Sequence, residues 1–417
     1  MFKWKTRYIA LSIIFFSSVV MGLDRMIIST AIPYMAKDLG LSPVQMGAAM
    51  SAFFIGYTTL QIPGGILVHK FGPRKIMLWG IAWWTAFTVF TGAIGSFVSM
   101  IIVRALFGAG EGVFPAAAFQ TLANWFPKKE RGTAVSIMTS CSAWGPALAP
   151  IIAALIISAY GWRETFYFMA LPGIVLIIWI WYSLTDDPAQ KKGISAQELA
   201  EIREEVTPQT LSEAKYSLWQ VLRVPAVWQS CLILFLFDIG IWGFRTWLPT
   251  YLVQARGFSL MKMGVVASLP FFAGGIGYIV GGWLSDKIFP NNRKAPIIIC
   301  QWISAIFLYL TFVTESPSLL VAWLTCAGFF LCVAFGAFWA LPMITLSKSI
   351  TGRGMSIINT GGQIAGASAP LIIGFLVQTS GGGFGTTFGF MIAGVLLSSL
   401  FALMVKTKRS EEHAKAV

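Results

Sequence analysis

Twelve long apolar stretches divide this chain of 417 residues, and they constrain its fold more than any other feature. A helix of about 20 apolar residues crosses the hydrocarbon core of a bilayer. The expected spans are 8–35, 45–68, 77–94, 99–124, 132–158, 164–184, 223–253, 263–285, 297–314, 319–347, 354–378 and 388–405. They predict an all-α membrane protein with twelve transmembrane helices.

The composition excludes several other classes of protein. Charged residues make up 11% of the chain, against roughly 25% in soluble domains. This argues against an ordinary soluble enzyme, a disordered chain and a secreted disulfide scaffold. An outer-membrane barrel would show short alternating segments instead of long apolar runs. All five cysteines lie in apolar stretches and the chain has two histidines, so we expect neither a metal site nor a cofactor.

The basic residues indicate the topology. With the N-terminus inside, Lys and Arg number 23 in the inside segments, 4 in the outside segments and 3 within spans. Such a bias predicts that both termini are cytoplasmic, and it accounts for the net charge of +13 without a nucleic-acid partner. The basic start followed by an apolar run is also typical of a signal peptide. Because Asp24 and Arg25 interrupt that run and no small-residue cleavage site follows, we interpret it as the first span.

The chain consists of two similar halves. We predict a six-helix bundle over 1–184, a cytoplasmic linker with a short surface helix over 185–222, and a second bundle with a short tail over 223–417. GGILVHKFGPRK at 64 resembles GGWLSDKIFPNNRK at 281, ERGTAVSIMTS resembles GRGMSIINTGG, and Ala-Pro pairs occur at 149 and 369. The similar offsets indicate a duplicated unit, which is the pattern of a secondary transporter with its site between the halves.

Six ionisable residues fall within the spans: Asp24, Arg25, Arg104, Glu111, Asp238 and Arg245. Ionisable groups at membrane depth are costly and are candidates for function. Asp24 lies near the middle of the first span and Glu111 near the middle of the fourth. Arg104 and Glu111 share a helix face but are separated by a rise of about 10.5 Å. We therefore expect both to find partners in the first-span pair. Glycines at 108, 110 and 112 would let another helix approach Glu111.

Two interpretations of these charges remain open. A buried carboxylate can bind and release a proton as a site opens and closes, and an arginine offers a planar fork for a carboxylate or phosphate. Alternatively, the charges form a fixed ion-pair cluster that specifies packing. Asp238 and Arg245 are also seven residues apart. Either they contribute to an outer vestibule, or Arg245 is an interfacial arginine that extends toward the headgroups.

Several stretches carry a resemblance to a known family. They are LDRMIISTAIPYM, YTTLQIPGGILVHKFGPRK, RALFGAGEGVFPAAAFQTLANWFPKKERGTA, WLPTYLVQARGFS, GGWLSDK and SIINTGGQIAGASAP. Over nearly its whole length the chain resembles the major facilitator superfamily, and within it the anion:cation symporters, such as bacterial sugar-acid permeases and sialin-like carriers. The resemblance implies two pseudo-symmetric six-helix bundles and alternating access. It also implies import of an organic carboxylate, such as a hexuronate, aldonate or aldarate, together with protons.

The resemblance also implies roles for single residues. Asp24 and Glu111 match an acidic pair that carries protons, while Arg25 and Arg104 match a basic pair in which Arg104 is tied either to the substrate or to the proton step. In the second span, Tyr57 matches a tyrosine that lines the sugar-acid site, and Gln61 follows one turn later. Asn359 matches an asparagine of the eleventh span that would bind substrate hydroxyls.

Two positions depart from the family pattern. In the loop after the second span, His69 replaces the aspartate that latches the cytoplasmic gate, while Arg74 matches. Either His69 makes gating sensitive to pH, or Asp286 in the second-half copy compensates for a lost latch. In the fifth span, Ser142 stands where sugar-acid relatives often have glutamine. This admits an aromatic acid or a small dicarboxylate as cargo.

Two other functions were weighed. An organophosphate:phosphate antiporter would have arginines eight residues before a proline in the first and seventh spans. Arg25 fits with Pro33, but Ile241 occupies the second position, with Arg245 one turn away. An integral membrane enzyme would show a nucleophile with its base or a cofactor motif, and none is visible. We therefore expect a monomeric carrier of the bacterial inner membrane, with a small organic anion and protons as its partners.

Overall fold

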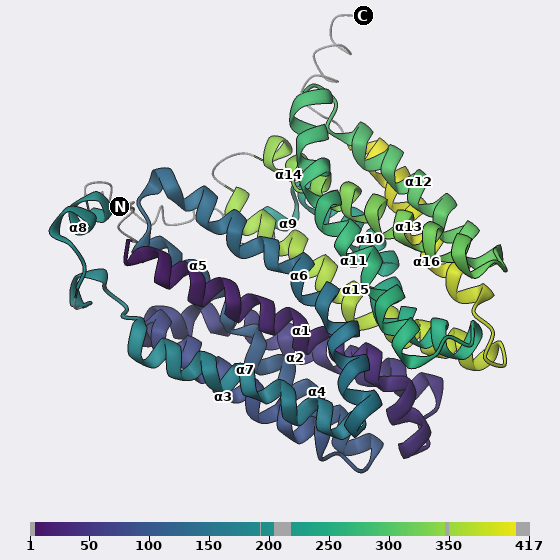
Figure 1. The fold of residues 1–417 in the computed structure, drawn as a ribbon. Helices are drawn as coiled ribbons and strands as arrows, with labels where there is room; N and C mark the ends of the chain where they lie inside the picture. Colours follow the sequence, from purple (N-terminus) through teal and green to yellow (C-terminus); the bar gives the residue numbers. More distant parts are fainter. Residues whose placement is uncertain (1–4, 192, 204–217, 347–349, 406–417) are drawn as a thin grey trace, which may run out of the picture. The chain divides into compact units, whose positions relative to one another are not determined.

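The computed structural model describes residues 5–191, 193–203, 218–346 and 350–405. Within these ranges every regular element is helical, and the chain divides into two compact units (Figure 1). Unit 1 comprises Met1–Leu41 and Ala48–Thr210, and unit 2 comprises Ser42–Gly47 and Leu211–Val417. The all-α membrane fold predicted from the apolar stretches is confirmed.

Unit 1 is built largely from the first set of helices. They are α1 (Arg7–Leu39), α2 (Pro43–Phe71), α3 (Pro73–Gly92), α4 (Phe97–Gly112), α5 (Phe114–Trp125), α6 (Lys128–Tyr160), α7 (Trp162–Ser183), η1 (Pro188–Gln190) and α8 (Ala196–Arg203). The fourth span is interrupted at Val113, where α4 ends and α5 begins. The short helix expected after the first bundle is present as α8.

Unit 2 is built from the second set. Its helices are α9 (Leu218–Leu222), α10 (Pro225–Thr250), η2 (Tyr251–Ala255), α11 (Leu260–Trp283), η3 (Leu284–Ile288), α12 (Lys294–Val313), α13 (Pro317–Phe338), α14 (Ala340–Thr345), α15 (Thr351–Thr379) and α16 (Gly385–Met404). Helix packing repeats between the units. In unit 1, α1 packs on α6, and α3 packs on α4 and α7; in unit 2, α10 packs on α15, and α12 packs on α13 and α16. Equivalent helices thus make equivalent pairs, as a duplicated six-helix bundle requires.

Eleven helices of the described chain are long and apolar enough to cross a membrane by length and composition. The remaining expected span corresponds to α3, which has 20 residues. Its mean hydropathy is lowered by Lys75 and by Trp79, Trp83 and Trp84, because tryptophan scores as slightly polar despite its large apolar surface. The length of α3 still suits a bilayer crossing.

The outer faces of the spans carry large apolar side chains. Ile62 and Ile279 are each 76% exposed and Trp79 is 74% exposed. Extended apolar surface of this kind is rare on soluble monomers and marks contact with a membrane or partner. With the long apolar helices, it identifies a multi-pass membrane protein.

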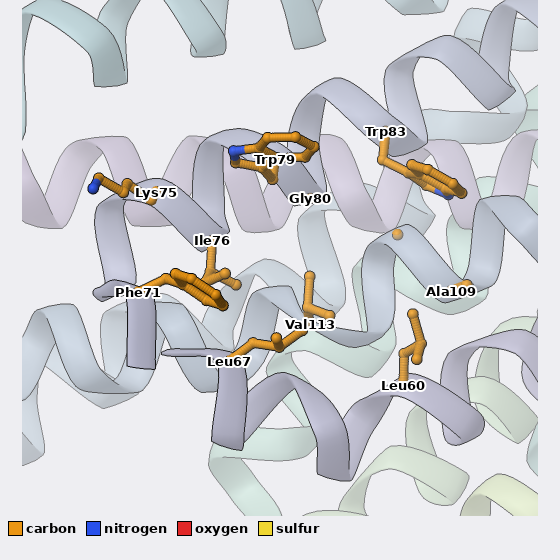
Figure 2. Close-up of a pocket in the computed structure, with 11 residues that line it drawn as sticks. Leu60, Leu67, Phe71, Lys75, Ile76, Trp79, Gly80, Trp83, Ala109 and Val113 are labelled. Atoms are coloured by element: carbon orange, nitrogen blue, oxygen red, sulfur yellow. The ribbon is translucent and has the colours of Figure 1, made fainter. Parts of the chain in front are cut away.

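A groove of about 430 Å³ opens between α2, α3 and the α4–α5 segment of unit 1 (Figure 2). Leu67, Trp79, Trp83 and Val113 are among the side chains that line it. Lys75 is the charged residue at its edge. A groove with this lining suits hydrocarbon, so we do not place the binding site of a polar ligand there.

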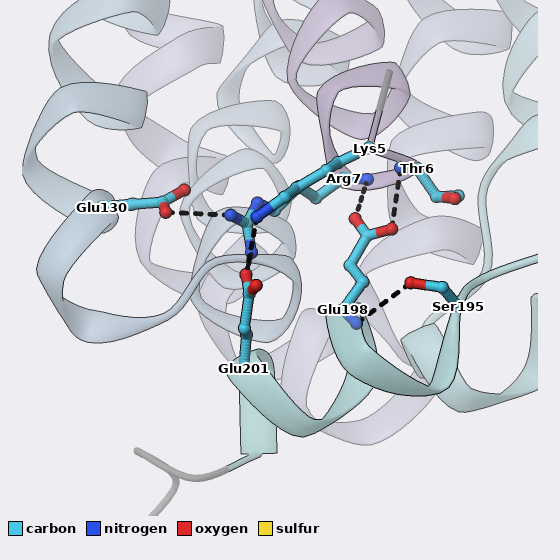
Figure 3. Close-up of polar contacts among 7 residues, drawn as sticks. All are labelled: Lys5, Thr6, Arg7, Glu130, Ser195, Glu198 and Glu201. Atoms are coloured by element: carbon cyan, nitrogen blue, oxygen red, sulfur yellow. Dashed lines mark hydrogen bonds and ion pairs between the residues drawn. The ribbon is translucent and has the colours of Figure 1, made fainter. Parts of the chain in front are cut away.

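Hydrogen bonds and ion pairs around the buried Arg7 hold the start of α1 to α8 (Figure 3). Glu198 accepts hydrogen bonds from the backbone N–H groups of Thr6 (3.0 Å) and Arg7 (2.8 Å). A carboxylate in this position satisfies unpaired donors and favours the helix dipole. The side chain of Arg7 is fully buried and bonds Glu201 at 3.0 Å and Glu130, at the start of α6, at 2.9 Å. Three carboxylates therefore offset a buried cation at the positive end of a helix.

We expect Arg7→Met to lower the thermal stability of the protein. The variant leaves carboxylates without their charged partner, which costs about 1–3 kcal/mol. Unfolding in detergent, followed by tryptophan fluorescence, measures the effect. Lys5→Met is the matched control, because Lys5 bonds the same Glu201 at 2.8 Å but is 38% exposed, so its loss costs less. An equal effect of the two substitutions would contradict this account.

Glu201 gives the cluster a predictable pH dependence. Its hydrogen bond to Lys5, together with Arg7, lowers the pKa of the Glu201 carboxyl below its usual range. A carboxyl with a lowered folded pKa stabilises the protein above its unfolded pKa, and that stabilisation is lost as pH falls through the folded pKa. Glu201→Gln should therefore reduce the melting temperature at pH 7, and the gap to the native protein should close on acidification below the usual glutamate range. A gap that widens with acid would show the opposite linkage.

Candidate functional site

A buried ion pair joins α1 to α4 in unit 1. Arg25 donates from Nε (3.2 Å) and Nη2 (2.8 Å) to Oε2 of Glu111, whose side chain is fully buried. The expectation that Glu111 finds its partner in the first span is confirmed. Both bonds end on one oxygen, and the buried Oε1 has no hydrogen-bond partner among the described residues.

Aromatic rings surround the two guanidinium groups. The guanidinium carbon of Arg25 lies 4.8 Å from the ring centres of Phe53 and Tyr57 on α2. That of Arg104 lies 5.4 Å from Phe53 and 4.6 Å from Phe107. Cations over ring faces gain attraction that increases when water is excluded. Both arginines therefore have favourable aromatic contacts in addition to their attraction to the carboxylates of the cluster.

Among the described residues, no first-span partner of Arg104 lies at ion-pair distance, although Arg104 interacts electrostatically with Asp24. In the described part of the chain, Glu111 pairs with Arg25, and neither Asp24 nor Arg104 takes part in an ion pair. Adjacent helical residues project about 100° apart, so Asp24 and Arg25 cannot both face α4 equally. Asp24 is 4% exposed and Arg104 is 2% exposed. Asp24 Oδ1 and Arg104 Nε are buried without a described hydrogen-bond partner, so the cluster contains a carboxylate and a guanidinium with spare bonding capacity.

Glycines make the cluster compact. A Cβ at Gly108 or at Gly112 would collide with the backbone carbonyl of Phe53 or of Tyr57. The same holds for a Cβ at Gly56 against Ala105. Close approach of α2 to the glycine-rich stretch of α4 is thus confirmed, although Gly110 faces Trp83 and Trp84 of α3 instead. This contact brings the rings of Phe53 and Tyr57 over the arginines.

The remaining candidates are distributed over both units. Tyr57 is buried in unit 1, and Gln61, one turn later on α2, is partly buried. In unit 2, Asn359 is partly buried on α15. Asp238 and Arg245 lie on α10 of the same unit, where Arg245 donates from Nη2 to the hydroxyl of Tyr278 at 2.9 Å.

The candidate gating residues lie at helix ends. His69 is exposed near the end of α2. Arg74 donates from Nη2 to the carbonyl of Trp181 at 2.7 Å, and its backbone N–H donates to Oδ1 of Asp186 at 2.7 Å. In unit 2, Asp286 pairs with Arg293 at 2.9 Å. The gating roles of His69, Arg74 and Asp286 stay predictions.

Several residues of these sites were missed from the sequence. Phe53 precedes Tyr57 by four residues, a spacing that places both on one helix face and that would have identified it. Tyr278 is a single aromatic residue in an apolar span and gives no comparable signal. Asp186 was assigned to a linker, but its carboxylate caps the start of α3 next to Gly72, whose φ of 84° favours glycine.

The family follows from the whole chain together with this geometry. A model of the Major Facilitator Superfamily matches residues 14–370. The chain belongs to this superfamily. Its members carry small molecules across membranes by alternating access, so this chain is a transporter and not an enzyme.

Curated relatives of this major facilitator protein carry organic anions according to their names. A probable sulfoacetate transporter of Cupriavidus necator is 31% identical, with 94% of this chain and 92% of the relative covered. A probable galactarate/D-glucarate transporter of Escherichia coli is 33% identical, with 89% and 88% covered. A hexuronate transporter of Bacillus subtilis is 27% identical, with 92% and 90% covered.

Solved structures support the fold. A bacterial homolog of the human lysosomal transporter Spinster, solved in an inward-facing conformation, superposes with a TM-score of 0.78 at 16% identity, with 96% of each chain covered. A D-xylose–proton symporter gives a TM-score of 0.76 at 17% identity, with 95% of this chain and 97% of the other covered.

We expect Gly108→Ala to disrupt the candidate site. The new Cβ meets the backbone carbonyl of Phe53, so α2 and α4 must separate, which costs about 1–3 kcal/mol. The variant should melt at a lower temperature in detergent and transport more slowly in proteoliposomes. Gly132→Ala on α6 is the control, because no atom lies within 4 Å of a Cβ at that position. If both variants behave alike, close helix contact at Gly108 is not what holds the site together.

Proposed function

We propose that the chain is a proton-coupled symporter that imports an organic carboxylate. The observation that carries the proposal is the buried bond between Arg25 and Glu111 beside the unpaired Asp24 and Arg104. In this arrangement, Arg25 is occupied by an internal carboxylate. A protonated Glu111 no longer holds Arg25 as an anion does, and the guanidinium becomes available to the carboxylate of a substrate.

Binding of the proton and binding of the substrate are coupled, because ionised Glu111 and the substrate carboxylate compete for Arg25. Proton binding at Glu111 strengthens substrate binding at Arg25, and by linkage substrate binding strengthens proton binding. Asp24 supplies a second proton-binding group in the same unit, and Arg104 a second cation for the anion. Tyr57 and Gln61 then line the site from α2, and Asn359 provides hydrogen bonds from unit 2.

Energetics give a reason for the coupling. An inside-negative potential opposes entry of an anion by about 2.3 kcal/mol per charge per 100 mV. One proton per monoanion makes entry electrically neutral, and a second proton makes the potential drive import. A carrier with two carboxylates beside its anion site has the groups to do this.

The anion class is proposed from chemistry and from relatives. A guanidinium fork donates N–H bonds to two oxygens of a carboxylate, and two oxygens of a sulfonate can accept the same bonds. The relatives include transporters named for sulfoacetate, galactarate, D-glucarate and hexuronates. We propose a hydroxylated sugar acid as cargo. Ser142 lies at the position where sugar-acid relatives often have glutamine. Sulfoacetate, aromatic acids and small dicarboxylates must therefore also be tested as substrates.

The membrane arrangement is part of the proposal. The excess of basic residues on one side supports cytoplasmic termini in a bacterial inner membrane. The linker 185–222 then lies in the cytoplasm between bundles 1–184 and 223–417, and the carrier acts as a monomer. Labelling of single exposed cysteines in intact cells and in inverted vesicles would test this orientation.

Substrate-induced proton flux tests the function. Proteoliposomes with an internal pH dye are exposed to hexuronates, aldonates, aldarates, sulfoacetate, aromatic acids, small dicarboxylates and sugar phosphates. We expect acidification with one anion class, and loss of it in Asp24→Asn and Glu111→Gln. Asp38→Asn is the matched control, because this carboxylate lies on the same helix as Asp24 but is 50% exposed in a surface pair with Arg163.

The other results are equally informative. Proton flux that persists in both variants would exclude Asp24 and Glu111 as the coupling groups. Phosphate exchange without carboxylate-induced acidification would replace the symporter with the organophosphate antiporter. Exchange of an anion without any proton flux would leave a carrier that is not coupled to protons.

A further inference from the structure

Unit 2 contains a buried carboxylate that has no role in the cycle proposed so far. Asp238 lies in the middle of the span formed by α10 and η2, and its side chain is 5% exposed. Oδ1 is buried and has no hydrogen-bond partner within the described ranges. No ion pair of Asp238 occurs among the described side chains.

Arg245 does not neutralise this carboxylate directly. The two residues are seven positions apart on α10, which corresponds to a rise of about 10.5 Å along the helix. Arg245 instead donates to the Tyr278 hydroxyl at 2.9 Å, and its guanidinium carbon lies 5.4 Å from the Trp242 ring centre. The guanidinium of Arg245 is thus held by Tyr278 of α11 and by contact with an aromatic ring.

The packing of α10 on α15 creates the space for Asp238. A Cβ at Gly362 of α15 would meet Oδ2 of Asp238, so the carboxylate lies directly against this glycine. Gln363, the next residue, leaves its buried Oε1 without a described partner. Asn359 lies one turn before Gly362 on the same helix, at the spacing that places residues on one face.

Few other titratable groups face Asp238. Those whose interaction with Asp238 the structure shows are Arg245 on α10 and Tyr278 on α11. The helices α9, α14 and α16 contain no titratable residue, and the side chain of Arg353, at the start of α15, lies outside the described residues. Among the described residues, Arg245 is the cation that interacts with an ionised Asp238, and it does so without forming an ion pair.

We infer that Asp238 is a third proton-binding carboxylate of the transport cycle, located in unit 2 beside the helix that carries Asn359. The inference rests on the proposed proton symport. A charged, unpaired carboxylate is costly at membrane depth, whereas a protonated carboxyl is far less so. A proton also turns Asp238 into a hydrogen-bond donor beside α15. The proton binds when the site opens to one side of the membrane and leaves when it opens to the other.

Accumulation at equilibrium measures the number of protons per anion. With the membrane potential clamped at zero, each coupled proton raises the accumulation of the anion about tenfold per unit of pH gradient. The substrate is the anion found active in the proton-flux panel. We expect Asp238→Asn to accumulate it about tenfold less than the native protein at a gradient of one pH unit. Glu315→Gln should match the native protein, because Glu315 is an exposed carboxylate of the same unit.

Counterflow of the same anion without a pH gradient provides the second readout. Asparagine mimics the protonated carboxyl in shape and charge, so Asp238→Asn should still exchange substrate. Asp238→Ser, with a smaller neutral side chain, should lose the same single proton if the asparagine variant does not fold. Accumulation equal to that of the native protein, or a folded variant that does not exchange, would overturn the inference.

The result is separable from a failure of the proposed function. If Asp24→Asn and Glu111→Gln both keep native proton flux, the symport scheme itself fails. If those variants lose proton flux while Asp238→Asn accumulates substrate like the native protein, the proposed function stands and the third proton site alone is rejected.

Discussion

The contact between Arg25 and Glu111 imposes the strongest constraint on unit 1. Opposite charges at membrane depth cost less when they pair and when the surrounding groups are arranged to suit them. Both hydrogen bonds reach a single oxygen of Glu111, at 2.8 and 3.2 Å, and aromatic faces cover the guanidinium. Gly108 and Gly112 allow α2 to approach α4 closely. This approach places Phe53 and Tyr57 of α2 beside the guanidinium of Arg25.

Duplication preserved the helix packing but not the charges. Helix α1 packs on α6 as α10 packs on α15, yet the polar groups that these helices bring together differ. In unit 1, an arginine of α1 pairs with a glutamate of α4. In unit 2, Arg245 bonds a tyrosine hydroxyl and Asp238 has no described partner. In the proposed cycle, Glu111 of unit 1 releases Arg25 on protonation, whereas Asp238 of unit 2 binds its proton without an ion-pair partner in the described structure, so the two bundles contribute differently.

The length of the apolar runs predicted the spans well, because a run of this length has few stable folds other than a membrane-spanning helix. The fold class and the glycine contact were therefore accessible from the sequence. Side-chain partners across helices were not, since they depend on how neighbouring helices are rotated. This is why Glu111 was correctly expected to find a partner in the first-span pair, while Arg104 interacts with Asp24 of that pair without forming an ion pair. Asp186 was hidden for a related reason: a polar loop residue gives no sign that it caps a distant helix.

In the proposed cycle, coupling requires no large rearrangement of the charges themselves. Arg25 can bond Glu111 or a substrate carboxylate strongly, but the two anions compete for one planar fork. An empty site with Glu111 ionised is internally neutralised, and a loaded site with Glu111 protonated is neutralised by its cargo. One unfavourable state has an ionised Glu111 together with a bound substrate anion. The other has a protonated Glu111 and no bound substrate. Unbalanced charge is costly in a bilayer. The same burial that stabilises the pair in the empty protein therefore favours states in which proton and anion are both bound or both absent.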